Sequence, residues 1–243
     1  MSILSPVLGE NTRAAFRASL ADGSLKAAVL PVGATEQHNE HLAMHHDCRS
    51  VETIALRACR ELFPAVVMCP TVAVGVSGHW MDHPGTLSLS PGTFTSVVFD
   101  VLDSLRSAGL YKVLIVNGHG GNRRPLLESL NDFNSRPGMH VECCSYWEAY
   151  PQDFIRVHVE SGECPGHAAE FETSFALAEF PENVHFTAGP YPEAEIKIRD
   201  PRRAADDRRF FANARLATAE KGRLYVGEAV KYIVSRLHSL LQD

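Results

Sequence analysis

A short stretch near the N-terminus of the chain is crowded with side chains that bind metals or transfer protons. It begins shortly after the apolar run KAAVLPV (26–32) ends. Glu36 and His38 are two positions apart, so on an extended segment both side chains point the same way. Asp47 closes the stretch just before a predicted helix, where capping the helix is the alternative role for a carboxylate. The seven ionisable residues of the stretch are Glu36, His38, Glu40, His41, His45, His46 and Asp47.

Three further motifs offer the same kinds of groups. The motif SGHWMDHPGT contains His79, and NGHGGN places His119 between glycines, which let the backbone approach a ligand closely. The motif PGHAAEFETS offers His167, Glu170 and Glu172. NGHGGN lacks the spacing of the common phosphate-binding loops, and a structural role for its histidine is the alternative interpretation.

These groups are hard oxygen ligands and imidazoles without converging thiolates, a set that favours catalytic Zn, Mn or Fe over a structural zinc site. Their number fits two divalent ions that share a carboxylate, roughly 3.5–4 Å apart. A hydroxide shared by both ions would serve as the nucleophile, so no Ser or Cys nucleophile is required. The six cysteines contain no CxxC pair, and we predict that they are reduced core residues.

Apolar runs alternate with helical patterns along the chain. We predict strands at 26–32, 65–74, 111–118 and 139–147, and helices at 48–63, 90–109, 123–134, 167–179 and 224–241. This alternation predicts an α/β fold with a mostly parallel sheet covered on both faces. Polar motifs follow all four strands, and ligands bind at the carboxyl ends of strands in such sheets. The Pro-rich region 181–201 is expected to be a surface connection.

The composition restricts the class of protein. A chain of 243 residues with 45% hydrophobic content suits one domain, residues 1–243. The net charge of -6 argues against nucleic-acid partners, and no stretch approaches the roughly 18 apolar residues of a membrane span. The N-terminus also lacks the pattern of a secretion signal. We therefore expect a soluble cytoplasmic protein that acts on a small molecule.

The four motifs PVGATEQHNEHLAMHHD, SGHWMDHPGTLSL, NGHGGN and HAAEFETS resemble those of the creatininase (creatinine amidohydrolase) family, in the family's order. The resemblance spans roughly residues 28 to 180. It implies a three-layer α/β/α sandwich, two divalent metal ions with zinc as the expected metal, and hydrolysis of amide C–N bonds. It also implies a homo-oligomer, often a hexamer, for which the apolar pattern of residues 224–241 gives mild support.

The resemblance also implies roles for single residues. Glu36 and His119 would hold the first metal, His38 would hold the second, and Asp47 would bridge them. His167 matches the family's catalytic histidine, as general acid for the leaving nitrogen or to orient the attacking hydroxide. Three further residues would line the pocket or support the ligands, namely His79, Trp147 and Glu172.

The chain departs from creatininases proper at two important positions. Gly121 replaces a glutamate ligand of the second metal, and we expect Glu170 to supply the missing carboxylate, because it lies one helical turn from His167. Glu172 would then point away from His167. Glu163 replaces one of two pocket tryptophans, which argues against creatinine itself and leaves other cyclic amides, formamides and small peptide-like amides as substrates. The alternatives are hydrolysis of a sugar-derived ketone or lactone, and a non-catalytic protein that only binds a metal or ligand.

Overall fold

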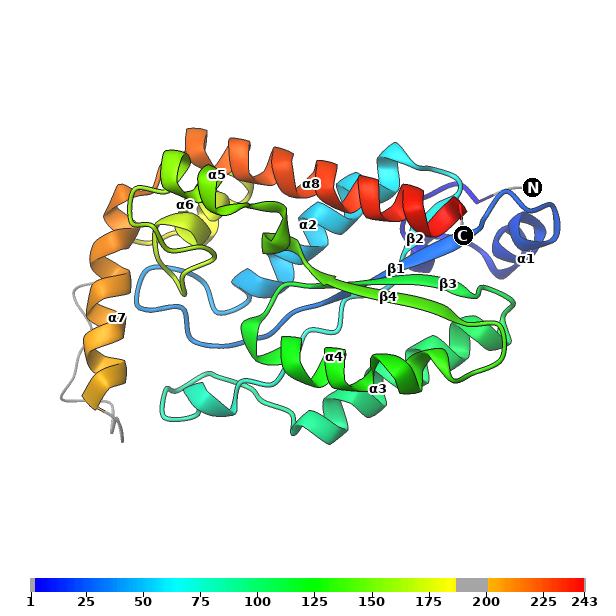
Figure 1. Ribbon diagram of the computed structural model, residues 1–243, viewed down its shortest axis with the longest axis horizontal. Coiled ribbons are helices and arrows are strands. Elements are labelled where there is room, and N and C mark those ends of the chain that lie inside the picture. Colours follow the sequence, from blue (N-terminus) through cyan, green and yellow to red (C-terminus); the bar gives the residue numbers. More distant parts are fainter. Residues whose placement is uncertain (1–2, 187–200, 243) are drawn as a thin grey trace.

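The centre of the protein is a four-stranded parallel sheet, shown in Figure 1 for a computed structural model that describes residues 3–186 and 201–242. The strands are β1 (Ala27–Val32), β2 (Val66–Met68), β3 (Lys112–Asn117) and β4 (His140–Ser145), in the order β2-β1-β3-β4. All six residues of β1 are buried, as expected for a parallel strand covered on both faces. The α/β fold and the parallel sheet predicted from the sequence are confirmed.

Helices cover both faces of the sheet (Figure 1). On one side lie α3 (Pro91–Ser107) and α4 (Gly120–Asn134), and on the other α2 (His46–Glu61), α6 (Glu170–Glu179) and α8 (Ala219–Gln242). A separate apolar cluster fills each of the two interfaces. The start of α3 follows ordinary capping chemistry: the Ser90 hydroxyl accepts from the Thr93 N–H, and Pro91 is the first residue of the helix.

The other elements lie at the ends of the sheet. They are α1 (Arg13–Ala21), α5 (Gln152–His158), α7 (Pro201–Asn213) and the 3-10 turns η1 (Leu8–Glu10), η2 (Gly78–Trp80), η3 (Tyr146–Ala149), η4 (Pro181–Asn183) and η5 (Ala214–Leu216). Several predicted boundaries change. The strand predicted at 65–74 is regular over only three residues, with one further bridge at Val72. The helix predicted from 167 begins at Glu170, and those predicted from 123 and 224 begin earlier, at Gly120 and Ala219. Of the predicted connection 181–201, residues 187–200 lie outside the described residues.

The apolar pattern of α8 is explained within the chain. Tyr225, Ile233 and Leu237 are fully buried in the cluster that also contains residues of α2 and α6. These side chains therefore do not indicate an exposed interface, and the homo-oligomer stays a prediction. Among the described helices, none has the length and apolar character needed to cross a bilayer.

The carboxyl ends of all four strands lie at the same edge of the sheet, as parallel pairing requires. The segments that follow β1, β2, β3 and β4 start there, and α7 stands beyond this edge in Figure 1. The four polar motifs of the sequence are thereby collected from distant parts of the chain.

Candidate active site

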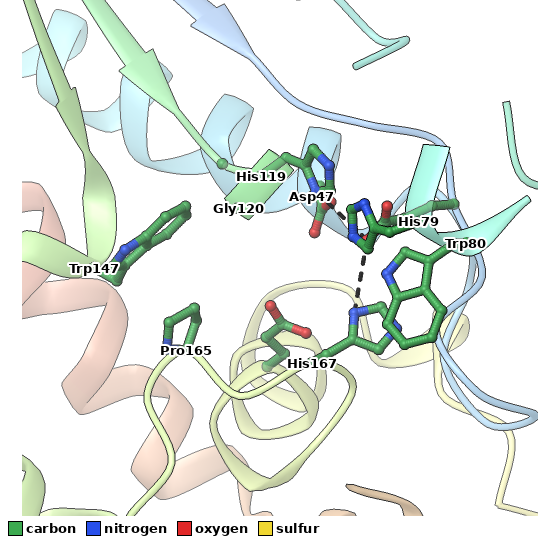
Figure 2. Close-up of a pocket in the computed structure, with 11 residues that line it drawn as sticks. Asp47, His79, Trp80, His119, Gly120, Trp147, Pro165 and His167 are labelled. Carbon is green, nitrogen blue, oxygen red and sulfur yellow. Dashed lines mark ion pairs between the residues drawn. The ribbon is translucent and has the colours of Figure 1, made fainter. Parts of the chain in front are cut away.

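A cavity of about 160 Å³ opens at this edge of the sheet (Figure 2). Acidic and imidazole side chains line its floor, and Trp80 and Trp147 lie on opposite sides of it. No Lys or Arg occurs among the described residues that line it. The lining residues are Glu36, Asp47, His79, Trp80, Gly118, His119, Gly120, Trp147, Pro165, His167 and Glu172.

His38 is oriented by the backbone. Its Nδ1 lies 3.1 Å from the Glu36 carbonyl oxygen, an acceptor, so Nδ1 donates and Nε2 keeps a lone pair in the neutral ring. That Nε2 lies 3.1 Å from Asp47 Oδ1 and 3.6 Å from Glu172 Oε2. A histidine that donates one N–H to a carbonyl and turns the other nitrogen toward carboxylates is typical of a metal ligand.

His119 is oriented in the same way but through its other nitrogen. Its Nε2 lies 3.1 Å from the Val76 carbonyl oxygen, so the lone pair of the neutral ring is on Nδ1. Nδ1 lies 3.0 Å from Asp47 Oδ2 and 3.4 Å from Glu36 Oε1. The two carboxylate oxygens of Asp47 therefore face two different histidines.

This arrangement fits metal ions well. In the neutral rings, lone pairs of nitrogen face lone pairs of carboxylate oxygen, which is favourable only with a cation or an added proton between them. Glu36 Oε2 and Asp47 Oδ2 are buried and have no hydrogen-bond partner, as expected for carboxylate oxygens that bind a metal ion. Potential ligand atoms gather in the groups Glu36–His79–His119, His38–Asp47–Glu172 and Glu36–His38–His167.

The pKa values of the same side chains reflect three buried carboxylates in one place. Burial raises the pKa of Glu36 to about 7 and that of Glu172 to about 8. Burial alone would lower the pKa of His38 and of His119. The nearby Asp47 carboxylate outweighs burial and raises the pKa of His38 to about 10 and that of His119 to about 9. Without metal, protons on the two histidines compensate the carboxylate charge.

The expectation that Glu170 points toward the metals is wrong. Its carboxylate is fully buried and accepts from the backbone N–H groups of Glu160 and Ser161, at 3.0 and 2.6 Å. Lys221 Nζ lies 2.7 Å from the same carboxylate. A carboxylate with these three donors is fully engaged and is not available to a metal.

Glu172 takes the place expected of Glu170. The reason is the helix boundary: His167 precedes α6, so helical spacing does not relate it to the glutamates. Ala168 has a positive φ of 48°, which turns the chain just before the helix. The Ala168 N–H donates to Glu172 Oε2 at 2.7 Å, and this bond directs the Glu172 carboxylate back toward His38.

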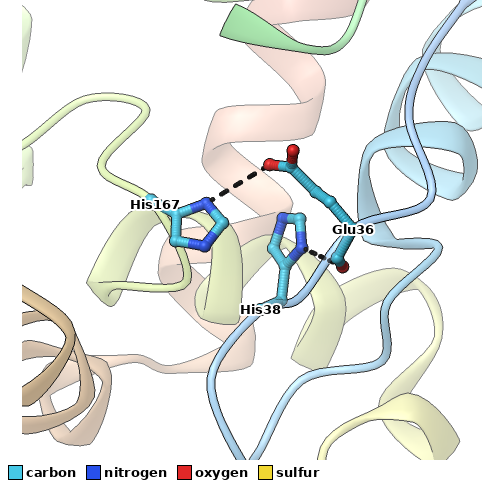
Figure 3. Close-up of side chains that lie close together, drawn as sticks. All are labelled: Glu36, His38 and His167. Carbon is cyan, nitrogen blue, oxygen red and sulfur yellow. Dashed lines mark hydrogen bonds and ion pairs between the residues drawn. The ribbon is translucent and has the colours of Figure 1, made fainter. Parts of the chain in front are cut away.

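His167 lies beside the ligand cluster, with Nδ1 3.6 Å from Glu36 Oε1 (Figure 3). Trp80 stacks on its ring, with centroids 4.5 Å apart and planes 23° apart. Gln37 Nε2 lies 2.8 Å from its Nε2. Neither contact is predicted from the sequence. The available signal for Trp80 and Gln37 is that each lies inside one of the four motifs.

The two departures of the sequence have structural explanations. A Cβ on Gly121 would lie 2.0 Å from the Val76 carbonyl oxygen and 2.6 Å from His119 Nε2, so no side chain fits there. Glu163 forms an ion pair with Arg209 of α7 and does not line the cavity. Of the other expected pocket residues, His79 and Trp147 do line it.

The model of the creatininase family described as creatinine amidohydrolase matches residues 10–237. The chain belongs to the creatininase family. It is 28% identical to the creatinine amidohydrolase of Pseudomonas putida, over 96% of both chains. It is 27% identical to a mycofactocin precursor peptide peptidase of Mycobacterium tuberculosis, over 96% of this chain and 92% of the relative. A mutant creatininase of the Zn-Zn type superposes with a TM-score of 0.81 at 25% identity, over 97% and 98% of the two chains.

Membership of this family makes the protein a hydrolase that acts on C–N bonds. The expected three-layer creatininase-like architecture is also confirmed. Solved creatininases of Zn-Zn and Mn types are among the similar structures, and the chain carries groups of residues that could hold such ions.

Proposed function

We propose that the protein is an amidohydrolase that uses two divalent metal ions held at the carboxyl edge of the sheet. The first ion would be held by Glu36 and His119 and the second by His38 and Glu172, with Asp47 shared between them. The observation that carries this proposal is the geometry of Asp47, whose two oxygens face the lone-pair nitrogens of two histidines at 3.1 and 3.0 Å. Zinc is the expected metal, with manganese or iron as alternatives.

The cations would supply an activated water and polarise the scissile carbonyl. Within the chain, His167 is the catalytic side chain of this proposal, because it lines the cavity beside Glu36 and is not among the residues proposed to hold the two ions. Trp80 lines the cavity beside His167 and stacks on its ring.

The cavity also restricts the substrate. A volume of about 160 Å³ is small beside the roughly 300–1,000 Å³ of pockets for drug-sized ligands. Its described lining offers two aromatic faces and no Lys or Arg to pair with an anion. We infer a small, uncharged amide, such as a formamide or a cyclic amide, rather than an acidic substrate.

Removal and return of metal, combined with a substrate panel, tests the proposal. The dialysed protein should hold no metal and hydrolyse none of a panel of formamides, cyclic amides and short peptides. Addition of Zn²⁺ or Mn²⁺ should restore hydrolysis of at least one neutral member, at two ions per chain. A protein that binds one ion per chain, or that stays active after complete chelation, would contradict the two-metal proposal.

A further inference from the structure

Gln37 lies in the sequence between Glu36 and His38, two of the proposed metal ligands. It is itself buried, with 6% of its surface exposed. Its side-chain amide makes two hydrogen bonds. Oε1 accepts from the backbone N–H of Asn39 at 2.9 Å, and Nε2 lies 2.8 Å from His167 Nε2. A buried amide satisfied on both sides is held in one orientation.

The first bond fixes which way the amide points. A backbone N–H can only donate, so the atom of Gln37 that faces Asn39 must be the oxygen. The NH₂ group, which can only donate, must therefore face His167. The Nε2 atom of His167 has to accept this bond, and a ring nitrogen that accepts carries no hydrogen. The single N–H of the ring is then on Nδ1.

The ring itself is held in place by its neighbours. Trp80 stacks on one face, and Phe210 of α7 approaches edge-on with centroids 6.0 Å apart. In this position Nδ1 points to the side of the cavity where Glu36 lies (Figure 3). Two uses of His167 are thereby excluded at Nδ1. A nitrogen that carries hydrogen cannot bind a metal, and a ring with one N–H would become an anion if it gave that proton away.

We propose that Gln37 is a positioning residue that holds His167 as the Nδ1–H tautomer, and that His167 uses this N–H to stabilise the oxyanion that develops from the substrate's carbonyl oxygen. This role differs from the proton donor and the hydroxide-orienting group expected from the sequence. It rests on the proposed function, since it assigns a task to a residue of that same site. A one-proton imidazole is an effective donor to a developing oxyanion because no proton has to move.

The tautomer is measured directly by two-bond ¹⁵N–¹H correlation spectra of the zinc-loaded protein with ¹⁵N-labelled histidine, and His167→Gln assigns the ring signals. We expect the Nδ1–H form in the native protein and in Asn39→Gly, which keeps the backbone N–H that anchors Gln37. Gln37→Met has a similar shape but no donor, and its ring should shift toward the Nε2–H form. An Nε2–H ring in the native protein, or an unchanged tautomer in Gln37→Met, overturns the proposal.

Kinetics then separates oxyanion stabilisation from proton donation to the leaving group. Removing one oxyanion donor costs about 10²–10³ in kcat. Gln37→Met should lose up to this factor with two metals still bound, and the loss should be alike for the amide found in the panel and for 4-nitrophenyl acetate, whose leaving group needs no proton. A variant that loses amide activity but keeps ester activity, or one that loses metal, contradicts the role. If the native protein hydrolyses neither compound, the proposed function fails, while the spectra still decide the tautomer.

Discussion

Gly121 and Gly120 provide a matched pair of substitutions at the start of α4. A Cβ on Gly121 would lie 2.0 Å from the Val76 carbonyl oxygen, whereas a Cβ on Gly120 would meet nothing within 4 Å. Carbon and oxygen in contact are normally about 3.3 Å apart, so in Gly121→Ala one of them must move by about 1 Å. Such overpacking lowers the free energy of unfolding by about 1–3 kcal/mol. For a domain of this size each kcal/mol lowers Tm by about 2–4 °C, so the midpoint should fall by several degrees.

The displaced carbonyl also orients a proposed ligand. Val76 accepts from His119 Nε2, and loss of such a partner typically lowers metal affinity about 10- to 100-fold. Gly121→Ala should therefore weaken binding of the first metal, while Gly120→Ala should leave both metal affinity and Tm close to the native values. Calorimetric titration with Zn²⁺ and thermal melts of the metal-free proteins measure the two effects. Equal metal affinity and equal Tm in the two variants would refute the reasoning about Gly121.

Three other expectations concern the same site. Glu172→Gln should reduce the metal content from about two ions per chain toward one, and Glu170→Gln should retain both; equal counts in the two variants would contradict this assignment. The metal-free protein should lose stability between about pH 6.5 and pH 9. The pKa values of Glu36 and Glu172 are raised from 4.5 to about 7 and about 8, and that of His119 is raised from 6.5 to about 9. A raised folded pKa contributes stability that is lost as pH rises through it. Melts with saturating Mn²⁺ should show a flatter dependence, and equal slopes would argue against metal at these carboxylates. Thiol alkylation should spare activity, since burial raises the pKa of every cysteine to about 12 or above; rapid inactivation by iodoacetamide would point to a thiol nucleophile.

The part of the site that follows β1 and β3 could be predicted because it depends on local pattern and sheet topology. Glu36 and His38 share a side of an extended segment, and the carboxyl ends of adjacent parallel strands bring His119 to the same edge. Asp47 was predicted just before a helix and lies in the first turn of α2. These positions need no knowledge of long-range packing beyond the order of the strands.

Contacts between segments that lie far apart in the sequence could not be predicted in this way. Gln37 and His167 are 130 positions apart, and the pair of His83 and Asp207 is 124 positions apart. Asp207 belongs to the charged segment 202–209, whose composition is typical of a solvent-exposed helix face. Its side chain is nevertheless fully buried in α7. Each contact depends on where a loop or helix docks, which local propensity does not determine.

Charge balance explains the exchange of roles between Glu170 and Glu172 better than helical spacing does. A buried carboxylate is stable only with a positive or hydrogen-bonding partner. Glu170 obtains Lys221, which lies 51 positions further along the chain, together with two backbone N–H groups. Glu36, Asp47 and Glu172 form ion pairs only with histidines among the described residues. In the metal-free protein, protons on His38 and His119 compensate this charge, whereas neutral imidazoles leave divalent cations as the partners that suit the three carboxylates. Glu170 is already paired with a lysine and does not belong to this cluster.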